Sequence, residues 1–235
     1  MAYELEQAEF ADTNPEPRCP VVLLLDTSYS MSNDPIDELN GGVRAFETSL
    51  KSDKLAAQRV EVAVVTFGGN VTALDGRTGH GSTAFDAQQA FVLVDEFTAP
   101  HLSASGDTPM GEAMRRALQL IRDRKDFYKS KDLDYYRPWI VLITDGQPTD
   151  DGWESAADEA RREEERHGVI IFPIGVGGAN MAQLGRFSTR QPLLLHGLNF
   201  KELFSWLSRS LQEVPRSKPG DQIPLPPVGW GTVAS

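Results

Sequence analysis

The sequence predicts a single α/β domain with a doubly wound, mostly parallel central sheet flanked by helices. Two apolar runs, residues 21–25 and 139–143, each lead into a polar turn that contains an aspartate. Unbroken apolar runs of this kind are typical of strands buried on both faces, and such strands belong to parallel sheets covered by helices. Segments with helical spacing of apolar residues alternate with the strand-like runs, which favours the α/β class.

The composition fits a globular domain and excludes some kinds of partner. The chain has 235 residues, 40% of them hydrophobic, with a net charge of -11 and a pI of about 4.8. Nucleic acid requires a basic face and is not expected as a partner, whereas a cation or a basic protein suits an acidic chain. The single cysteine, Cys19, excludes an intrachain disulfide and is expected in the core. Because no run approaches about 20 apolar residues and no signal-peptide pattern is present, a cytoplasmic protein is expected.

The first predicted strand is followed directly by a helix. The strand covers residues 20–25, and a polar loop leads to Asp34, a candidate N-cap, and Pro35, which suits the first helical position. The apolar residues that follow recur at helical spacing and predict a buried face: Leu39, Val43, Phe46 and Leu50.

The next part of the chain is rich in strand signals. Residues 60–67 contain several valines and end at a pair of glycines, which predicts a strand. Segment 70–82 predicts a short strand with loops, and 90–94 a further strand. Thr108 then suits the N-cap of a helix with Pro109 at its first position. The buried face of that helix is predicted from helical spacing: Met110, Ala113, Met114, Ala117, Leu118 and Ile121.

The remaining elements continue the alternation of strands and helices. The charged and aromatic segment 125–137 predicts a surface connection. Asp150 or Asp151 is expected to cap the helix that follows. The other elements are predicted from the same patterns: strands at 139–143, 169–175 and 193–195, and helices at 153–167, near Met181 and at 200–211.

These elements form one predicted domain, residues 19–213, between two segments of different composition. Residues 1–18 are an acidic lead-in that is expected to be flexible or to add a short edge strand. Residues 214–235 are rich in Pro and Gly, which predicts an extended or disordered tail.

Polar side chains gather where predicted strands end. The loop after the first strand carries Asp26, Ser28 and Ser30, and the run 139–143 leads into Asp145. Open α/β sheets bind their ligands at the carboxyl ends of strands. The alternate spacing of the two serines lets both hydroxyls point the same way. Oxygen donors of this kind are the ligands that hard cations prefer, so the sequence predicts a Mg2+ site.

The sequence also resembles the von Willebrand factor A domain family. Its metal-ion-dependent adhesion site is built from an Asp-x-Ser-x-Ser loop, a distant Thr and a later Asp. The resemblance covers about residues 20–213, and five positions match in order: Asp26, Ser28, Ser30, Thr108 and Asp145. It implies a Rossmann-like fold and a Mg2+ ion, with Mn2+ or Ca2+ as alternatives, held partly through water. The open coordination position would take a carboxylate from a protein partner, which is recognition without turnover, so an enzyme is not expected.

Four segments further resemble TerY-type proteins, which are bacterial cytoplasmic A-domain proteins of tellurite-resistance and stress operons. These segments are residues 24–32, 40–42, 105–113 and 200–208. The resemblance implies a role in stress signalling beside a protein kinase and a protein phosphatase of the same operon. The cysteine-rich zinc segment of some relatives has no counterpart in this sequence, so that function is not expected.

Simpler interpretations remain open for these residues. A Thr before Pro-Met is a good N-cap, so Thr108 could cap a helix, with or without binding a metal. Ser28 and Ser30 could be turn residues bonded to local backbone, and Asp107 is expected to be a solvated loop acid. Two other functions compete. A phosphotransfer enzyme or receiver-like protein would use Asp26 as acceptor, although no acidic pair or later Lys is evident. A scaffold would keep the loops without metal dependence.

Overall fold

The structure, a computed structural model, describes residues 14–82, 84–214 and 226–233. Within these ranges a nine-stranded sheet forms the centre, in the order β4, β3, β2, β1, β6, β7, β8, β9, with β5 paired to β2. Five of these described strands run parallel: β1 (Cys19–Asp26), β2 (Val60–Gly68), β6 (Trp139–Thr144), β7 (Ile170–Gly175) and β8 (Leu193–Leu195). The predicted α/β class with a mostly parallel sheet is confirmed.

The outer strands are short and antiparallel to their neighbours. They are β3 (Asn70–Leu74), β4 (Gly81–Ser82), β5 (Val92–Leu93) and β9 (Gly231–Val233). The short strand expected in segment 70–82 is present as β3 and β4. The strand expected at 90–94 is only partly right, because the chain first forms the helical turn α4 (Ala87–Ala90) and only two residues then pair with β2.

β1 is the central strand, and both hydrophobic cores depend on it. All eight of its residues are buried, including Cys19. Val21, Leu23 and Leu25 face one core, and Val22 and Leu24 face the other, as the two-residue period of a strand requires. Full burial of each such side chain contributes about 1.5–3 kcal/mol. The apolar run that predicted the fold is therefore the part of the sheet that both helical layers cover.

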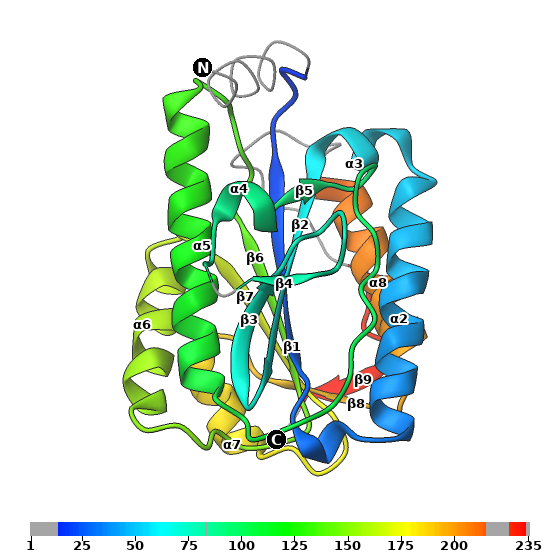
Figure 1. Ribbon diagram of the computed structural model, residues 1–235, viewed down its shortest axis with the longest axis vertical. Coiled ribbons are helices and arrows are strands. Elements are labelled where there is room, and N and C mark those ends of the chain that lie inside the picture. Colours follow the sequence, from blue (N-terminus) through cyan, green and yellow to red (C-terminus); the bar gives the residue numbers. More distant parts are fainter. Residues whose placement is uncertain (1–13, 83, 215–225, 234–235) are drawn as a thin grey trace.

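Helices cover both faces of the sheet (Figure 1). One face carries α2 (Asp34–Lys51), α3 (Lys54–Arg59) and α8 (Phe200–Glu213). The other carries α4, α5 (Met110–Ser130), α6 (Trp153–Glu165) and α7 (Met181–Leu184). Asp34, the predicted N-cap, is instead the first residue of α2, and the N-cap is Asn33.

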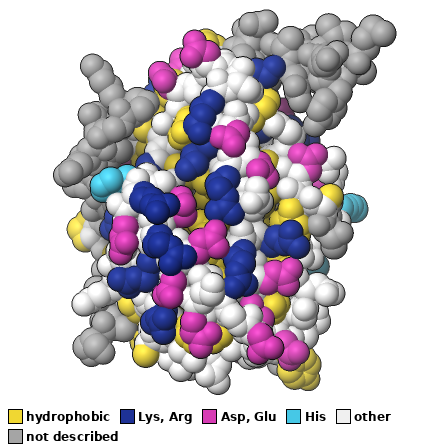
Figure 2. Space-filling view, turned by 90° about the vertical axis from the view of Figure 1, so that its left-hand side faces the viewer, with side chains coloured by type: hydrophobic (Ala, Val, Ile, Leu, Met, Phe, Trp, Pro, Cys, Tyr) yellow, Lys and Arg dark blue, Asp and Glu magenta, His cyan; other side chains and the backbone are white. Residues whose placement is uncertain are grey.

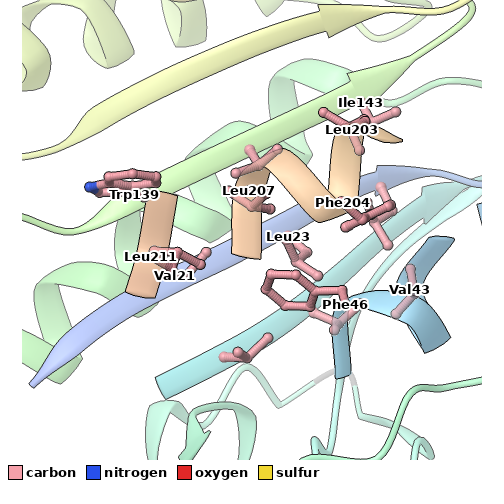
Figure 3. Packing of buried hydrophobic residues seen from close by; sticks show 14 of the residues in the cluster. Val21, Leu23, Val43, Phe46, Trp139, Ile143, Leu203, Phe204, Leu207 and Leu211 are labelled. Atoms are coloured by element: carbon pink, nitrogen blue, oxygen red, sulfur yellow. The ribbon is translucent and has the colours of Figure 1, made fainter. Parts of the chain in front are cut away.

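Helix α8 packs closely on the sheet and on α2 (Figure 3). Its inward side chains lie over β1 and β6: Leu203, Phe204, Leu207 and Leu211. The rings of Phe46 and Phe204 are 5.6 Å apart. A Cβ on Gly42 of α2 would stand 2.5 Å from the Phe204 ring, so only glycine permits this approach of the two helices. Because α2 begins just after the loop that follows β1, this packing also fixes the position of that loop.

The surface connection predicted at 125–137 is wrong in its first half, because α5 continues to Ser130. The charged pattern misled because Tyr128 in this segment, and Arg124 just before it, point inward to a buried acid. Arg124 Nε lies 2.8 Å from Glu61 Oε2, Tyr128 OH donates to the same oxygen, and Arg18 Nε lies 3.3 Å from Glu61 Oε1. A buried carboxylate is stable only when paired in this way.

The predicted tail is partly ordered. Residues 226–233 lie against the domain, and β9 pairs with β8 at the edge of the sheet. Trp230 is buried beside Trp206, whose indole N–H donates to Pro226 O at 2.8 Å. The prediction of an extended or disordered tail is therefore wrong for these residues, while 215–225 and 234–235 lie outside the described residues, as do residues 1–13 of the predicted lead-in. In the ranges that the structure covers, every helix is too short or too polar to cross a membrane.

Candidate metal centre

The polar loops after β1 and β6 lie side by side at one edge of the sheet. The two strands are parallel, and Leu25 pairs with Ile143, which brings Asp26 next to Thr144. Thr144 Oγ1 donates a hydrogen bond to Asp26 Oδ2, although the two residues are 118 positions apart. The carboxyl ends of adjacent strands thus bring the loop after β1 and the loop after β6 together.

A series of hydrogen bonds joins these two loops. Asp26 Oδ1 accepts a hydrogen bond from Ser28 N at 2.8 Å, and Ser28 Oγ lies 3.0 Å from Ser30 Oγ. Ser30 Oγ donates to Asp145 Oδ1 at 2.7 Å. The two serine hydroxyls are therefore neighbours, as their alternate spacing predicts. Four of the five predicted site residues are linked in this series.

Thr108 reaches the same place from the middle loop, residues 103–109, which precedes α5. A Cβ on Gly146 would lie 3.3 Å from Thr108 Oγ1 and 3.7 Å from Asp26 Oδ2, so both oxygens flank this glycine. Thr108 is buried, and its backbone N–H and C=O both bond to Thr149 at 3.0 Å. All five predicted site residues therefore meet at the carboxyl edge of β1 and β6.

Close backbone contacts hold the middle loop against the ends of β1 and β2. Tyr29 N donates to Gly106 O, and Ser105 N donates to Thr27 O, both at 2.8 Å. Gly106 has a φ of +69°, and a Cβ there would stand 2.4 Å from Gly69 Cα. Glycine is needed at this position for both reasons. The close approach explains how a loop far along the chain reaches the end of the first strand.

Asp26 is fully buried, which makes its ionisation unfavourable. Burial raises the pKa of the Asp26 carboxyl to about 6, although hydrogen bonds from Ser28 and Thr144 act in the opposite direction. The nearby Asp145 carboxylate adds to the rise. Two neighbouring carboxylates, one of them desolvated, favour a cation between or beside them.

The N-terminus of α5 is capped from another loop rather than by Thr108. Its N-cap residue is Pro109. The Asp150 carboxylate accepts hydrogen bonds from Gly111 N at 3.0 Å and from Glu112 N at 2.8 Å. The predicted capping role of Thr108 is therefore wrong, and its side chain lies against Gly146 instead.

The same contacts correct the prediction for the next helix. The N-cap of α6 is Gly152, with a φ of 74°, so neither Asp150 nor Asp151 caps it. Asp150 instead ties the loop after β6 to the helix that follows Thr108. Sequence reasoning missed this role, and also the role of Thr144 as a partner of Asp26. The single local signal for Thr144 is a hydroxyl at the end of an otherwise apolar strand.

The spacing of the oxygen atoms fits a small hard cation. With bonds of about 2.1 Å, adjacent ligands of an octahedral ion are about 3.0 Å apart. The contacts of Ser30 Oγ with Ser28 Oγ and with Asp145 Oδ1, at 3.0 and 2.7 Å, are close to this separation. Across residues 14–82, 84–214 and 226–233, no three His, Cys, Asp or Glu side chains gather as a metal-binding group. Any ion here would depend on hydroxyl as well as carboxylate oxygens, which favours Mg2+-type chemistry over a nitrogen or sulfur site.

Fold and site together define a Rossmann-like domain with an oxygen-rich polar centre at the carboxyl edge of its sheet. The family description "von Willebrand factor type A domain" matches residues 21–203, well over half of the chain. The protein belongs to the von Willebrand factor type A domain family. Domains of this family are in general adhesion and interaction modules rather than enzymes.

Solved structures of low sequence identity share the fold. Proximal thread matrix protein 1 from the mussel byssus is 19% identical, with a TM-score of 0.54 over 86% of this chain and 47% of that chain. A second structure of that protein is described as having a zinc-occupied MIDAS motif, the metal-ion-dependent adhesion site. A von Willebrand factor type A structure from Catenulispora acidiphila is 14% identical, with a TM-score of 0.54 over 84% and 43% of the two chains.

The pilus adhesin SpaC from Lactobacillus rhamnosus GG has the same fold, with 13% identity and a TM-score of 0.59 over 86% of this chain and 32% of the adhesin. The chain thus spans less than half the length of these three proteins. No curated protein matches the sequence. At these identities the likeness shows the fold alone.

Proposed function

We propose that this chain is a non-enzymatic, divalent-metal-dependent protein-interaction module. A carboxylate from a protein partner would complete the coordination of the ion. The ion itself would be held by the five residues of the candidate metal centre: Asp26, Ser28, Ser30, Thr108 and Asp145. The observation that carries this proposal is the series of hydrogen bonds from Asp26 to Asp145, in which the hydroxyls of Ser28 and Ser30 and the Asp145 carboxylate are in direct contact.

Mg2+ is the proposed metal, with Mn2+ and Ca2+ as alternatives. Both oxygens of Asp26 already accept hydrogen bonds, from Ser28 N and from Thr144 Oγ1. This supports contact between Asp26 and the ion through water, which Mg2+ tolerates because it gives up its hydration shell reluctantly. Zinc belongs in the same test, since it is named for the site of the mussel byssus protein.

The burial of Asp26 argues against the phosphotransfer alternative. A phospho-acceptor must expose a carboxylate oxygen to its donor, and Asp26 is 0% exposed. The scaffold alternative makes no use of the oxygen cluster and predicts no metal binding. It is separated from our proposal by titration with metal ions.

The cellular setting is a finer proposal that rests on the sequence segments similar to TerY-type proteins. We place the module in the bacterial cytoplasm, in tellurite resistance and stress signalling. Its partners there would be proteins, including a kinase and a phosphatase of the same operon, and not nucleic acid. Capture of partners from the native host, with and without a chelator, tests this part of the proposal.

Calorimetric titration of the chelator-treated protein with Mg2+, Mn2+, Ca2+ and Zn2+ tests the metal centre. We expect reversible binding at one site, weakened by more than about tenfold in Asp26→Ala, which corresponds to about 1.4 kcal/mol. Asp95→Ala is the matched control, because it removes an exposed carboxylate outside the centre.

Three results would contradict parts of this assignment. An unchanged isotherm in Asp26→Ala would show that Asp26 has no part in binding the ion. Failure of the wild-type protein to bind any of the four metals would favour the scaffold. Uptake of a phosphoryl group from acetyl phosphate would favour the phosphotransfer enzyme.

A further inference from the structure

Charge is distributed unevenly between the two edges of the sheet. The segments at the carboxyl edge that follow β1, β2, β6 and β7, with the loop before α5, contain nine Asp or Glu and no Lys or Arg. They are residues 26–37, 67–72, 103–112, 144–154 and 176–184. The segment after β8, residues 196–202, adds one Glu and one Lys. The segments that lead into the same parallel strands at the opposite edge contain eight Lys or Arg and five Asp or Glu. They are residues 14–18, 51–59, 129–138 and 165–169. The carboxyl edge is thus more acidic than the overall charge requires.

On one flank of the molecule Lys and Arg side chains lie among Asp and Glu side chains (Figure 2). Lys and Arg side chains gather over α5 and α6, and few of them lie at the lower end of the view, where the carboxyl edge of the sheet is. Two arginines of α5 are paired with acids: Arg122 Nη1 lies 3.0 Å from Glu159 Oε1, and Arg116 Nε lies 3.6 Å from Glu112 Oε1. These two arginines are thus offset by acids on the same flank, whereas Arg115 Nη2 donates to Gly152 O at 2.6 Å, so one guanidinium reaches the loop after β6.

Helix dipoles explain part of this acidity but not all of it. The first turns of α2, α5 and α6 carry carboxylates that stabilise these helices: Asp34, Asp37, Glu112 and Glu154. Asp107 and Asp151 are exposed and lie outside the helices, in the loops that also carry Thr108 and Asp145. A divalent ion would offset two of the charges at this edge. The potential left by the others stays negative and attracts cations.

Tyr29 is a second, independent feature of this edge. It is 76% exposed, the one exposed large hydrophobic side chain in the part of the chain that the structure describes. It lies between Ser28 and Ser30, and its backbone is fixed by hydrogen bonds with Gly106 O at 2.8 Å and with Ser32 N at 3.1 Å. A tyrosine held in this way suits the anchor of an interface. Its ring face also attracts ammonium and guanidinium groups.

From these two features we propose that the partner presents its metal-binding carboxylate between Lys or Arg side chains, one of which packs on the ring of Tyr29. This inference rests on the proposed function, since it specifies the partner of the same metal centre. A carboxylate alone is attracted by the ion but repelled by the acidic loops around it. Flanking cations remove that repulsion and complement the loops, which raises both the rate and the specificity of association.

Three labelled synthetic peptides of equal length test this inference by fluorescence anisotropy at low salt with Mg2+. Each has one central Glu, flanked on both sides by Lys, by Ser or by Asp. The Lys-flanked peptide is expected to bind about tenfold more tightly than the Ser-flanked one, with the Asp-flanked one weakest. A chelator should abolish binding of all three, and added salt should reduce the advantage of the Lys-flanked peptide.

Matched variants separate a local effect from the general attraction of an acidic protein for a basic peptide. The double variant Asp107→Asn and Asp151→Asn should lose most of the preference for flanking Lys. The double variant Asp132→Asn and Asp134→Asn makes the same change in net charge at the opposite edge and should keep the preference. Tyr29→Ser should weaken binding of the Lys-flanked peptide more than binding of the other two, and Tyr29→Phe should bind it as the wild-type protein does.

The results that overturn the inference differ from those that overturn the proposed function. If Mg2+ binds but the three peptides bind equally, or none binds at millimolar concentration, the inference is wrong while the metal centre stands. An equal loss of preference in the two double variants also contradicts the inference. If Mg2+ itself does not bind, the proposed function is wrong.

Discussion

Replacing Asp26 by Asn is expected to stabilise the metal-free protein at neutral pH and to abolish its response to Mg2+. The carboxyl of Asp26 is fully buried, and burial raises its pKa to about 6. In the unfolded chain an aspartate has a pKa of about 3.9. Folding therefore favours the protonated acid. Stability is lost as the pH rises from about 4 to about 6, and the loss is complete at neutral pH.

The size of the effect follows from this difference. Two pKa units correspond to about 3 kcal/mol at neutral pH, where the buried carboxylate must ionise in the folded state. Asparagine is neutral and avoids this cost, but it replaces the oxygen that accepts the hydrogen bond from Thr144, a contact worth about 1 kcal/mol. The net gain expected for Asp26→Asn is about 2 kcal/mol in the absence of metal.

Urea denaturation in the presence of a chelator measures this gain. The variant should exceed the wild-type protein by about 2 kcal/mol at about pH 7.5 and show no advantage at about pH 4. Mg2+ at about 100 times its Kd should stabilise the wild-type protein by about 2.7 kcal/mol and leave the variant unchanged. A variant that is less stable than the wild-type protein at neutral pH without metal would refute the reasoning about the buried charge. Equal stabilisation of both proteins by Mg2+ would refute the metal centre.

Three further predictions concern pH and the supporting contacts. Calorimetry should find Mg2+ bound about tenfold more weakly at about pH 5 than at about pH 7.5, because Asp26 must lose its proton to accept the ion; a pH-independent affinity would contradict this. In urea denaturation Asp150→Ala should lose about 1 kcal/mol of stability through the uncapped α5, whereas Asp151→Ala should lose little. Glu61→Gln should lose roughly 3 kcal/mol by the same measurement, since it leaves two buried arginines without their carboxylate; a loss below about 1 kcal/mol would contradict that account.

Local patterns in the sequence were sufficient for the parallel strands and for the residues of the candidate metal centre that follow strands, whereas Thr108 was expected there only from the family resemblance. β1 is an apolar run that ends in Asp26, β6 is an apolar run followed by Asp145, and their pairing in register brings Asp26 beside Thr144. The closeness of the Ser28 and Ser30 hydroxyls follows from the alternate spacing of the two residues. These features are predictable because the information lies within a few residues of each strand end.

The contacts that the sequence did not reveal join distant segments. Asp150 caps a helix that begins 40 residues earlier, and no local pattern distinguishes that role from capping α6. Arg124 and Tyr128 look like surface residues until Glu61 is known to lie beneath them. β9 has three residues and follows a segment rich in proline, so the composition of that segment predicts a tail and hides the strand. In each case the partner lies far along the chain, and only tertiary structure determines the pairing.

The indole rings of Trp206 and Trp230 provide an intrinsic optical reporter. Their centres are 5.5 Å apart with an interplanar angle of 62°, a geometry in which the electronic transitions of the two rings couple. Near-ultraviolet circular dichroism should therefore contain a band that disappears when the last strand leaves the sheet. Trp206 lies on α8, which packs on α2, and α2 begins close to the loop that carries Ser28. This band therefore allows a label-free measurement of whether ligand binding at the metal centre loosens the contact between α8 and the last strand.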